Sequence, residues 1–241
     1  MPSSIYKKQR GETSTGFTLL ELLIVVSIIA ILSVALIFVL NPAETLKKSR
    51  DAQRISDLAA LKTAIGIYTT GTVSPLIGGA SNIGCKTGAL GGTYVSGNKI
   101  FYSLAGIGGI ADTTLDGGAN SIPAPLQVAS TDLTLTDGTG WLPVDFDSLI
   151  GGSPISSLPI DPVNIITDTA RVSGISASGN PPDYVYRYAC NATNLTYEVD
   201  AVLESATYTS SDNKMTKDGG DNSSYYEVGT NLKILGIGTD F

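Results

Sequence analysis

The apolar residues of this chain are concentrated in one long run near its beginning. Residues 17–40 contain 24 residues with a single charge, Glu21. As a helix with a rise of about 1.5 Å per residue, the run would span roughly 36 Å, which is enough to cross a bilayer with some tilt. The buried helix of a soluble protein is the alternative, but a run this long without polar relief is more typical of lipid. The pattern therefore predicts a transmembrane helix over residues 17–40.

A polar leader with three cations, residues 1–16, precedes this run. The layout is similar to a secretory signal, although the apolar part of an ordinary signal has only about 7–15 residues. Glu21 is the unusual residue, since a carboxylate inside a membrane helix costs a few kcal/mol unless it has a partner or a route to water. Composition alone leaves open whether Glu21 has a partner or reaches the headgroups.

The string GFTLLE at residues 16–21, followed by the unbroken apolar run, resembles the class III signal of bacterial type IV pilins and type II secretion pseudopilins. The resemblance implies that a prepilin peptidase cuts between Gly16 and Phe17 and that Phe17 is then N-methylated. It also implies that Glu21 pairs with the N-terminal amine of a neighbouring subunit during assembly. On this resemblance the chain is a structural subunit and not an enzyme. Its expected partners are copies of itself, other pilin-like subunits, the prepilin peptidase, the inner-membrane assembly platform and the membrane.

A second helix is predicted over residues 41–70. Asn41 suits a helix N-cap, Pro42 the first helical position and Glu44 a capping box, so the helix restarts here or continues with a kink at Pro42. The apolar positions at helical spacing, with charged residues between them, are Leu46, Ile55, Leu58, Leu61, Ile65 and Tyr68. The charged residues between them are Lys47, Lys48, Arg50, Asp51, Arg54, Asp57 and Lys62. This amphipathic pattern predicts one apolar stripe that packs on the later part of the chain.

The composition changes sharply after this helix. Residues 71–140 hold 15 of the 27 glycines, which predicts a long connection with short strands or turns at most. The Pro-rich stretch from Trp141 to Asn164 follows, and it resembles the region ahead of the sheet in major pseudopilins. The predicted divisions are a leader (1–16), a membrane and filament-core helix (17–40), an amphipathic helix (41–70), the Gly-rich connection (71–140) and an antiparallel sheet with its loops (141–241).

Alternating apolar and polar residues predict strands in the last third of the chain. Residues 183–190 and 195–203 alternate, and residues 191–194 suit the loop of a hairpin with one buried face. Residues 231–235 form a third candidate strand. A sheet of such strands packed on the amphipathic helix gives an α+β, pilin-like fold.

Two further features carry predictions. Asp218, Asp221 and Asn222 offer hard oxygen ligands on a Gly-rich loop, and several of the pseudopilins that this chain resembles bind calcium in their C-terminal loop, so these residues are candidate calcium ligands. Plain Asx turns are the alternative. Cys85 and Cys190 would both lie outside the cytoplasm, where a disulfide persists, and a bridge between them could contribute about 4–5 kcal/mol. Two free buried thiols are the alternative to that bridge.

Composition excludes several function classes. The chain has no histidine and two cysteines, which removes histidine-based acid–base catalysis, zinc sites and iron–sulfur clusters. Its net charge of -7 makes nucleic-acid binding unexpected. A hydrolase using two of Asp145, Asp147 and Asp161 is one remaining alternative, and an anchored binding domain that does not polymerise is another. The expected location is the inner membrane, with the C-terminal part extracytoplasmic and later in a periplasmic or surface filament, but the system served stays open.

Overall fold

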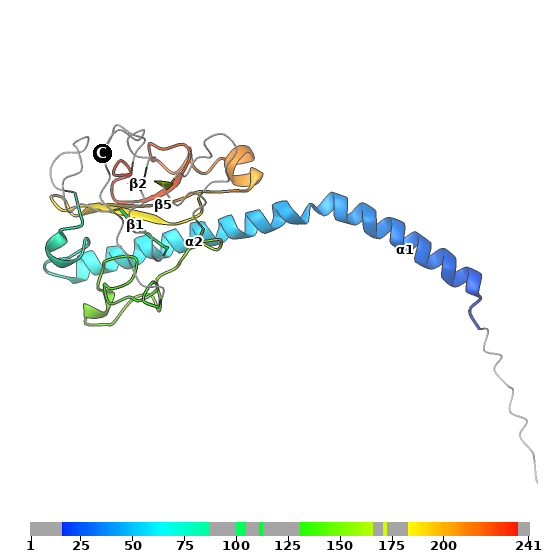
Figure 1. Ribbon diagram of the computed structural model, residues 1–241, viewed down its shortest axis with the longest axis horizontal. Coiled ribbons are helices and arrows are strands. Elements are labelled where there is room, and N and C mark those ends of the chain that lie inside the picture. Colours follow the sequence, from blue (N-terminus) through cyan, green and yellow to red (C-terminus); the bar gives the residue numbers. More distant parts are fainter. Residues whose placement is uncertain are drawn as a thin grey trace, which may run out of the picture. The chain divides into compact units, whose positions relative to one another are not determined.

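The computed structural model describes residues 16–86, 100–104, 111–112, 131–165, 171–172 and 183–235. The chain divides into two compact units, Met1–Ala43 and Glu44–Phe241, and each is described by itself. Figure 1 shows the elements, which are α1 (Leu19–Leu40), α2 (Pro42–Gly71), β1 (Phe101–Tyr102), β2 (Ala111–Asp112), β3 (Arg171–Val172), β4 (Arg187–Asn191), β5 (Thr196–Ala201), β6 (Tyr226–Gly229), and the short helical turns Ala80–Asn82, Phe146–Ser148 and Thr207–Ser211.

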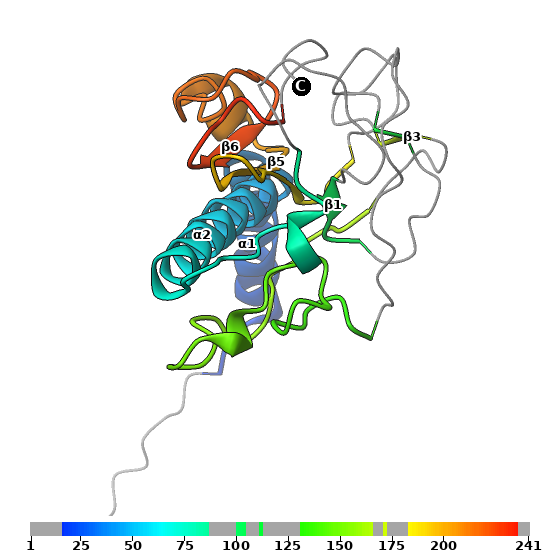
Figure 2. The same ribbon diagram turned by 90° about the vertical axis from the view of Figure 1, so that its left-hand side faces the viewer.

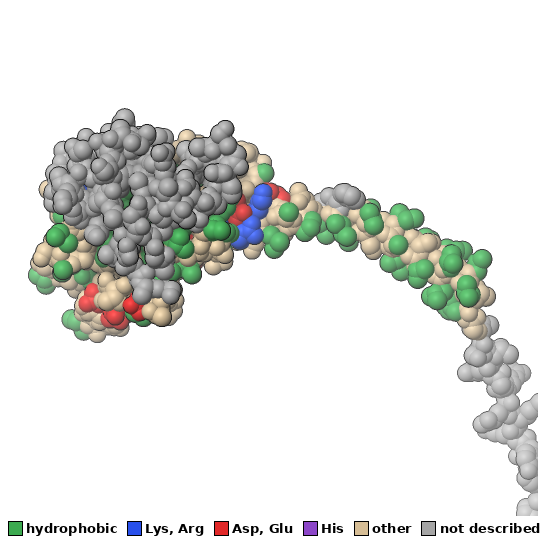
Figure 3. Space-filling model, in the orientation of Figure 1, with side chains coloured by type: hydrophobic (Ala, Val, Ile, Leu, Met, Phe, Trp, Pro, Cys, Tyr) green, Lys and Arg blue, Asp and Glu red, His purple; other side chains and the backbone are tan. Residues whose placement is uncertain are grey.

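Helix α1 makes up the described part of the first unit. Its described side chains are mostly apolar, and they are exposed, as the space-filling view shows (Figure 3). The stretch Leu19–Ile37 is long and apolar enough to cross a membrane. The helix ends at Asn41, which has a left-handed conformation (φ 38°, ψ 72°) that asparagine tolerates better than most residues. The prediction of a long apolar N-terminal helix is confirmed.

Helix α2 starts immediately after this residue, with Pro42 as its first helical position. Proline is favoured there because its fixed φ suits the helix and its missing N–H has no helical acceptor to lose. Of the two alternatives read from the sequence, the restart is therefore the one observed. Glu44 lies in the first turn of α2, and its carboxylate accepts a hydrogen bond from the backbone N–H of Ala206.

The apolar stripe of α2 packs into the core of the second unit over its C-terminal half. The buried members of the predicted stripe are Leu58, Leu61, Ile65 and Tyr68. Leu46 is exposed and Ile55 is half-buried, so full burial of the stripe begins closer to the C-terminal end of the helix than the pattern predicts. The ring of Tyr68 meets Phe146 edge-on, with centroids 5.9 Å apart.

Two charged residues of α2 lie where the sequence places a solvated face. Asp51 and Arg54 are fully buried, so that part of the prediction is wrong. The reason is an ion-pair cluster: Arg54 donates to Asp51, Asp161 and Glu204 at 2.7–2.9 Å. Burial alone would lower the pKa of Arg54, but the hydrogen bonds to these three carboxylates outweigh it and raise that pKa. Arg54 therefore stays charged inside the fold.

The main sheet has four strands in the order β1-β4-β5-β6, all antiparallel to their neighbours. The predicted hairpin is present as β4 and β5, with Tyr188 opposite Val199. The third strand lies at β6 instead of residues 231–235, which corrects the prediction. Those residues form a turn, and the N–H groups of Ile234 and Leu235 donate to the side chain of Glu198. The α+β architecture is confirmed.

Both faces of the β4–β5 hairpin are buried, whereas the alternation predicts one buried face. One face packs on α2, where Tyr186 and Tyr197 donate their hydroxyl hydrogens to the Asp57 carboxylate and the Lys62 carbonyl. The other face is polar and is covered by the chain that follows β5. Figures 1 and 2 show this segment, coloured orange to red, on the side of the sheet opposite to α2. The polar strand positions are buried because the chain folds back over them.

Residues 131–165 complete the core from the other side of α2 (Figure 2). Trp141 is fully buried, lies 6.4 Å from the ring of Tyr186 and donates from Nε1 to the carbonyl of Pro159. The Gly-rich connection contributes β1 to the main sheet, and β2 pairs with β3 as a small parallel ladder. In its described residues, this connection therefore adds short strands to the fold.

Candidate functional site

The segment ahead of α1 is open to solvent in the structure. Gly16, Phe17 and Thr18 precede the first helical residue, and Phe17 is 80% exposed. A Cβ built on Gly16 would meet nothing within 4 Å. The peptide bond between Gly16 and Phe17 therefore lies on accessible chain directly before a helix.

The Glu21 carboxylate turns back to this segment. Its Oε2 accepts hydrogen bonds from the backbone N and the Oγ1 of Thr18, both at 2.9 Å. In return, the backbone N–H of Glu21 donates to Thr18 Oγ1 at 3.2 Å. These reciprocal bonds form a capping box, which satisfies two amide donors of the helix start. The box holds the Glu21 carboxylate at the N-terminal end of α1, beside Thr18.

Thr18 is the residue of this site that sequence reasoning missed. The signal was present, because Thr18-Leu19-Leu20-Glu21 has the Thr-x-x-Glu spacing of a capping box ahead of an apolar run. Thr18 therefore joins Gly16, Phe17 and Glu21 as the fourth residue of the N-terminal site.

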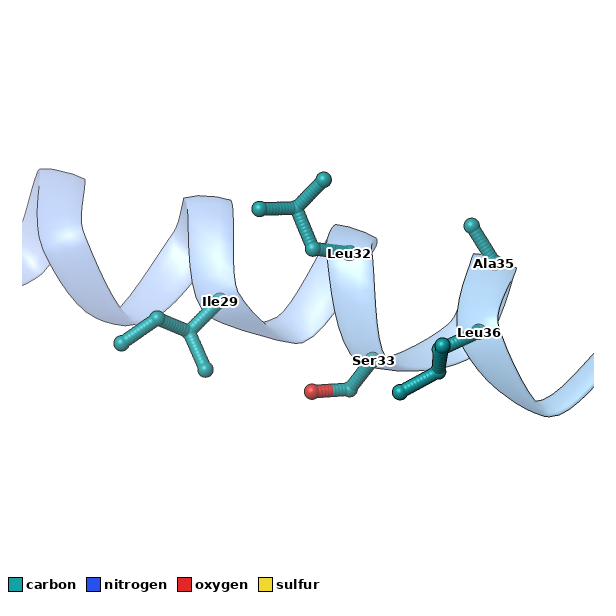
Figure 4. A pocket seen from close by; sticks show the side chains of 5 residues that line it. All are labelled: Ile29, Leu32, Ser33, Ala35 and Leu36. Carbon is teal, nitrogen blue, oxygen red and sulfur yellow. The ribbon is translucent and has the colours of Figure 1, made fainter.

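The remainder of α1 offers packing surface. Figure 4 shows a shallow hollow along the helix that is lined by Ile29, Leu32, Ser33, Ala35 and Leu36. None of these side chains is titratable, and the one polar group is the Ser33 hydroxyl. The surface is suited to contact with lipid or with another apolar helix.

Residues 13–37 match the family model described as the prokaryotic N-terminal methylation motif. The chain carries the class III signal of type IV pilins and pseudopilins. This signal implies processing by a prepilin peptidase and assembly with other pilin subunits. Neither the curated proteins nor the solved structures gave a match to this chain. The cut after Gly16, the methylation of Phe17 and the assembly role of Glu21 stay predictions.

The two cysteines of the chain are joined. Cys85 and Cys190 form a disulfide with their Cα atoms 4.6 Å apart. Backbone hydrogen bonds flank it, from Lys86 N to the Cys190 carbonyl and from Ala192 N to the Lys86 carbonyl, both 2.8 Å. The bridge therefore ties the end of the Ala80–Lys86 segment to β4, where the sequence analysis expects it.

The acids named for a hydrolase serve structural roles. Asp161 accepts two hydrogen bonds from Arg54 in the buried cluster. Asp145 accepts from the backbone N–H of Ser148, and Asp147 accepts from the Thr136 hydroxyl. Asp161 is buried whereas Asp145 and Asp147 are exposed, so the structure gives the three acids different surroundings.

The loop predicted to bind calcium is shaped by its own side chains. Asp218 accepts from the N–H groups of Gly220 (3.0 Å) and Glu227 (2.8 Å), and Asn222 Oδ1 accepts from Ser224 N (3.0 Å). The oxygens of Asp221 are shielded from solvent. Across the described ranges, no three Asp, Glu, Cys or His side chains gather as a metal-binding group. Calcium at Asp218, Asp221 and Asn222 stays a prediction.

A glutamate from β6 reaches into this loop, and the sequence analysis did not include it. Glu227 Oε2 accepts from Asn222 N at 3.1 Å, and a Cβ on Gly220 would lie 1.8 Å from that same oxygen. Glu227 also contacts Glu198 of β5, and burial raises the pKa of both carboxyl groups. A hydrogen bond joins the two carboxyl groups, and it raises the pKa of Glu227 further. Glu227 is therefore the protonated partner of this buried pair.

Proposed function

We propose that this chain is a structural subunit of a type IV pilus or a type II secretion pseudopilus, cut between Gly16 and Phe17 and assembled through α1. The observation that carries the proposal is the methylation-motif match over residues 13–37, which coincides with an exposed apolar helix. A helix with apolar side chains on all sides suits both lipid and the centre of a helix bundle. One segment can therefore store the subunit in the membrane and later pack in a filament.

Glu21 supplies the polar contact of this assembly. A carboxylate among apolar helices is unfavourable unless it is paired, and the methylated amine of Phe17 in a neighbouring subunit is a cation of suitable position. The capping box already holds Glu21 at the end of the helix where that amine arises. The amine of the incoming subunit would join or replace the Thr18 hydrogen bonds.

The second unit would lie outside the cytoplasm in this proposal. The disulfide between Cys85 and Cys190 supports this side, because disulfides persist in oxidising compartments. The single candidate span found in the described residues, Leu19–Ile37, would anchor the subunit in the inner membrane before assembly.

The mass of the N-terminal peptide tests the proposal. The protein is recovered from cells that express its own prepilin peptidase, and its N-terminus is measured. We expect a chain that begins at N-methylated Phe17. A chain that keeps residues 1–16 would overturn the processing step and favour a membrane-anchored binding domain that does not polymerise.

Substitution at Glu21 tests assembly separately from processing. Glu21→Asp keeps the negative charge and Glu21→Ala removes it. We expect the alanine variant to be processed but lost from sheared filaments, while the aspartate variant keeps part of the assembly. An anchored domain that does not polymerise would be retained in the membrane equally in both variants.

A further inference from the structure

The chain contains three acceptor triplets for N-linked glycans, which have the form Asn-x-Ser/Thr with a residue other than proline in the middle. The triplets begin at Asn191, Asn194 and Asn222. Such triplets also arise by chance in polar sequences, so the sequence alone selects none of the three. The structure separates them, because it gives the three asparagines different surroundings.

Asn191 and Asn222 are built into the fold, and each is 2% exposed. Asn191 Oδ1 accepts hydrogen bonds from Thr193 N at 2.9 Å and from Asn194 N at 3.4 Å. Asn222 Oδ1 accepts a hydrogen bond from Ser224 N at 3.0 Å. A glycan is bulky and hydrophilic, so on either side chain it would have to displace the protein atoms around these bonds. The folded second unit therefore excludes a glycan at both positions.

Asn194 has the opposite surroundings. It lies in the turn between β4 and β5, and it is exposed. Its backbone N–H donates to Asn191 Oδ1, whereas its side-chain amide has no hydrogen bond among the described residues. A glycan on this amide would project into solvent from the end of the hairpin. The fold therefore accommodates a glycan at Asn194.

The last residue of this triplet carries a hydroxyl that the fold does not use. Thr196 is the first residue of β5 and is half-buried, and its Oγ1 is shielded from solvent without a hydrogen-bond partner. A buried hydroxyl without a partner is unfavourable, and valine would suit a strand position without that cost. The hydroxyl is, however, the group that makes this stretch an acceptor triplet. Its presence is explained by a use outside the folded hairpin.

We propose that Asn194 carries an N-linked glycan, transferred from an oligosaccharide that is bound to a membrane lipid through pyrophosphate. Asn194 Nδ2 forms a bond to the anomeric carbon of the first sugar and loses one proton to water. The bond from that carbon to the pyrophosphate oxygen breaks, and its electron pair stays with the leaving lipid pyrophosphate, so the step needs no oxidant or reductant. Because Thr196 Oγ1 is covered in the folded hairpin, the transferase reads the triplet before β4 and β5 pair.

This modification rests on the extracytoplasmic location that the proposed function gives to the second unit, because such triplets are used in secreted chains. It goes beyond that function, since neither storage in the membrane nor assembly through α1 requires a glycan on the β4–β5 turn. The glycan adds a solvated group to one end of the sheet.

Peptide mass spectrometry of the full-length protein, recovered from its own cells, tests the proposal. Trypsin would release Asn191 and Asn194 in one peptide and Asn222 in another. We expect added sugar mass on the first peptide, with fragmentation placing all of it on Asn194, and no added mass on the second. An unmodified Asn194 overturns the proposal, and so does a glycan on Asn191 or Asn222.

The N-terminal peptide of the same digest distinguishes this proposal from the proposed function. A chain that begins at Phe17 and has an unmodified Asn194 overturns the glycan and leaves the processing intact. A chain that keeps residues 1–16 but carries sugar on Asn194 overturns the processing and supports the glycan.

Four variants test the triplet itself. Asn194→Gln and Thr196→Val should each lose the added mass completely, whereas Thr196→Ser keeps the hydroxyl and should keep the glycan. Since Thr196 Oγ1 has no partner in the fold, the valine variant should melt no lower than the Asn194→Gln protein, which shows that its loss of sugar is not a loss of folding. Thr193→Val is the matched control: it breaks the Asn191 triplet at an exposed turn position and should leave the glycan in place. A glycan that persists in Thr196→Val, or that is lost in Thr193→Val, contradicts the assignment.

Discussion

Arg54 on α2 and Asp161 in the Pro-rich segment form a buried ion pair through two hydrogen bonds of 2.7 and 2.9 Å, although 107 residues separate them. Planar guanidinium and carboxylate groups match in this geometry, which fixes orientation as well as distance. Through Glu204, the same guanidinium also connects α2 to the chain that follows β5. One side chain therefore joins three distant parts of the second unit.

Replacing Arg54 by methionine should destabilise the second unit severely. The change keeps apolar bulk but leaves the carboxylates of Asp51 and Asp161 buried without their cation. Removing one partner of a buried pair typically costs about 3–5 kcal/mol of unfolding free energy, which denaturant titration can measure. Lys48→Met, at an exposed position of the same helix, is the control and should change that energy by less than about 0.5 kcal/mol. An Arg54→Met protein whose unfolding free energy lies within about 1 kcal/mol of the wild-type value would contradict the role of the cluster.

Tyr186→Phe should produce a pH-dependent loss of stability. Burial raises the pKa of Asp57 above 3.8, and the hydrogen bond from Tyr186 opposes that rise. Because the folded-state pKa is raised, the wild type loses some stability as the pH rises through it. The variant raises that pKa further, so its deficit should be about 1.5–3 kcal/mol at neutral pH and should shrink below pH 3.8, where Asp57 is protonated.

Unfolding free energies of both proteins across this pH range provide the measurement. Tyr208→Phe, at a half-buried tyrosine after β5, is the control and should show no comparable pH dependence. A Tyr186→Phe deficit that is constant with pH would mean that the hydroxyl does not act through Asp57.

Gly78→Ala should interfere with the disulfide region. The added Cβ would lie 2.3 Å from Cys85 Sγ and 2.8 Å from Cys85 N, where neither the bridge nor the backbone can yield easily. We expect a loss of about 1–3 kcal/mol in unfolding free energy and an increased free-thiol content. Gly66→Ala is the matched control, since its Cβ meets nothing within 4 Å in α2 and should stabilise the helix by up to about 1 kcal/mol. Equal effects of the two changes would rule out the steric argument.

Thr18→Ala should impair assembly, whereas Thr18→Ser should retain it. Alanine removes the hydroxyl that caps Glu21 N and contacts the Glu21 carboxylate, while serine keeps that oxygen. The loss of such a cap is about 1 kcal/mol, or roughly fivefold in the ratio of assembled to unassembled subunit. The measurement is the share of the subunit in sheared filaments against membranes. Wild-type assembly of the alanine variant would show that the capping box plays no part in it.

The sequence predicted those parts of the fold that depend on local patterns. The run over residues 17–40 and the Leu58–Tyr68 stripe need only composition and period, and the structure has both helices. The burial of Asp51 and Arg54 could not be read in the same way, because their partners Asp161 and Glu204 lie more than 100 residues away. Sequence reasoning assigns a charged residue to the solvent-exposed face of a helix. Only contacts with distant parts of the chain show that such a residue is buried.

The sheet shows the same limit. The alternation over β4 and β5 predicted the hairpin, but the burial of its polar face depends on the chain that folds back after β5. Residues 231–235 have a strand-like composition, and they form a turn because Glu198 binds the N–H groups of Ile234 and Leu235. In the N-terminal site the missed residue, Thr18, had a local signal that was readable in the sequence.

The disulfide has a mechanical consequence in the proposed filament. Cys85 and Cys190 are 105 residues apart in the chain, so a tensile force between α2 and the C-terminus crosses the sulfur bond and bypasses everything between them. Without the bridge, the residues between the two cysteines could extend to a length of roughly 350 Å under tension. With it, residues 86–189 lie outside the covalent path of that force, so their contour length adds nothing to the extensibility of the subunit.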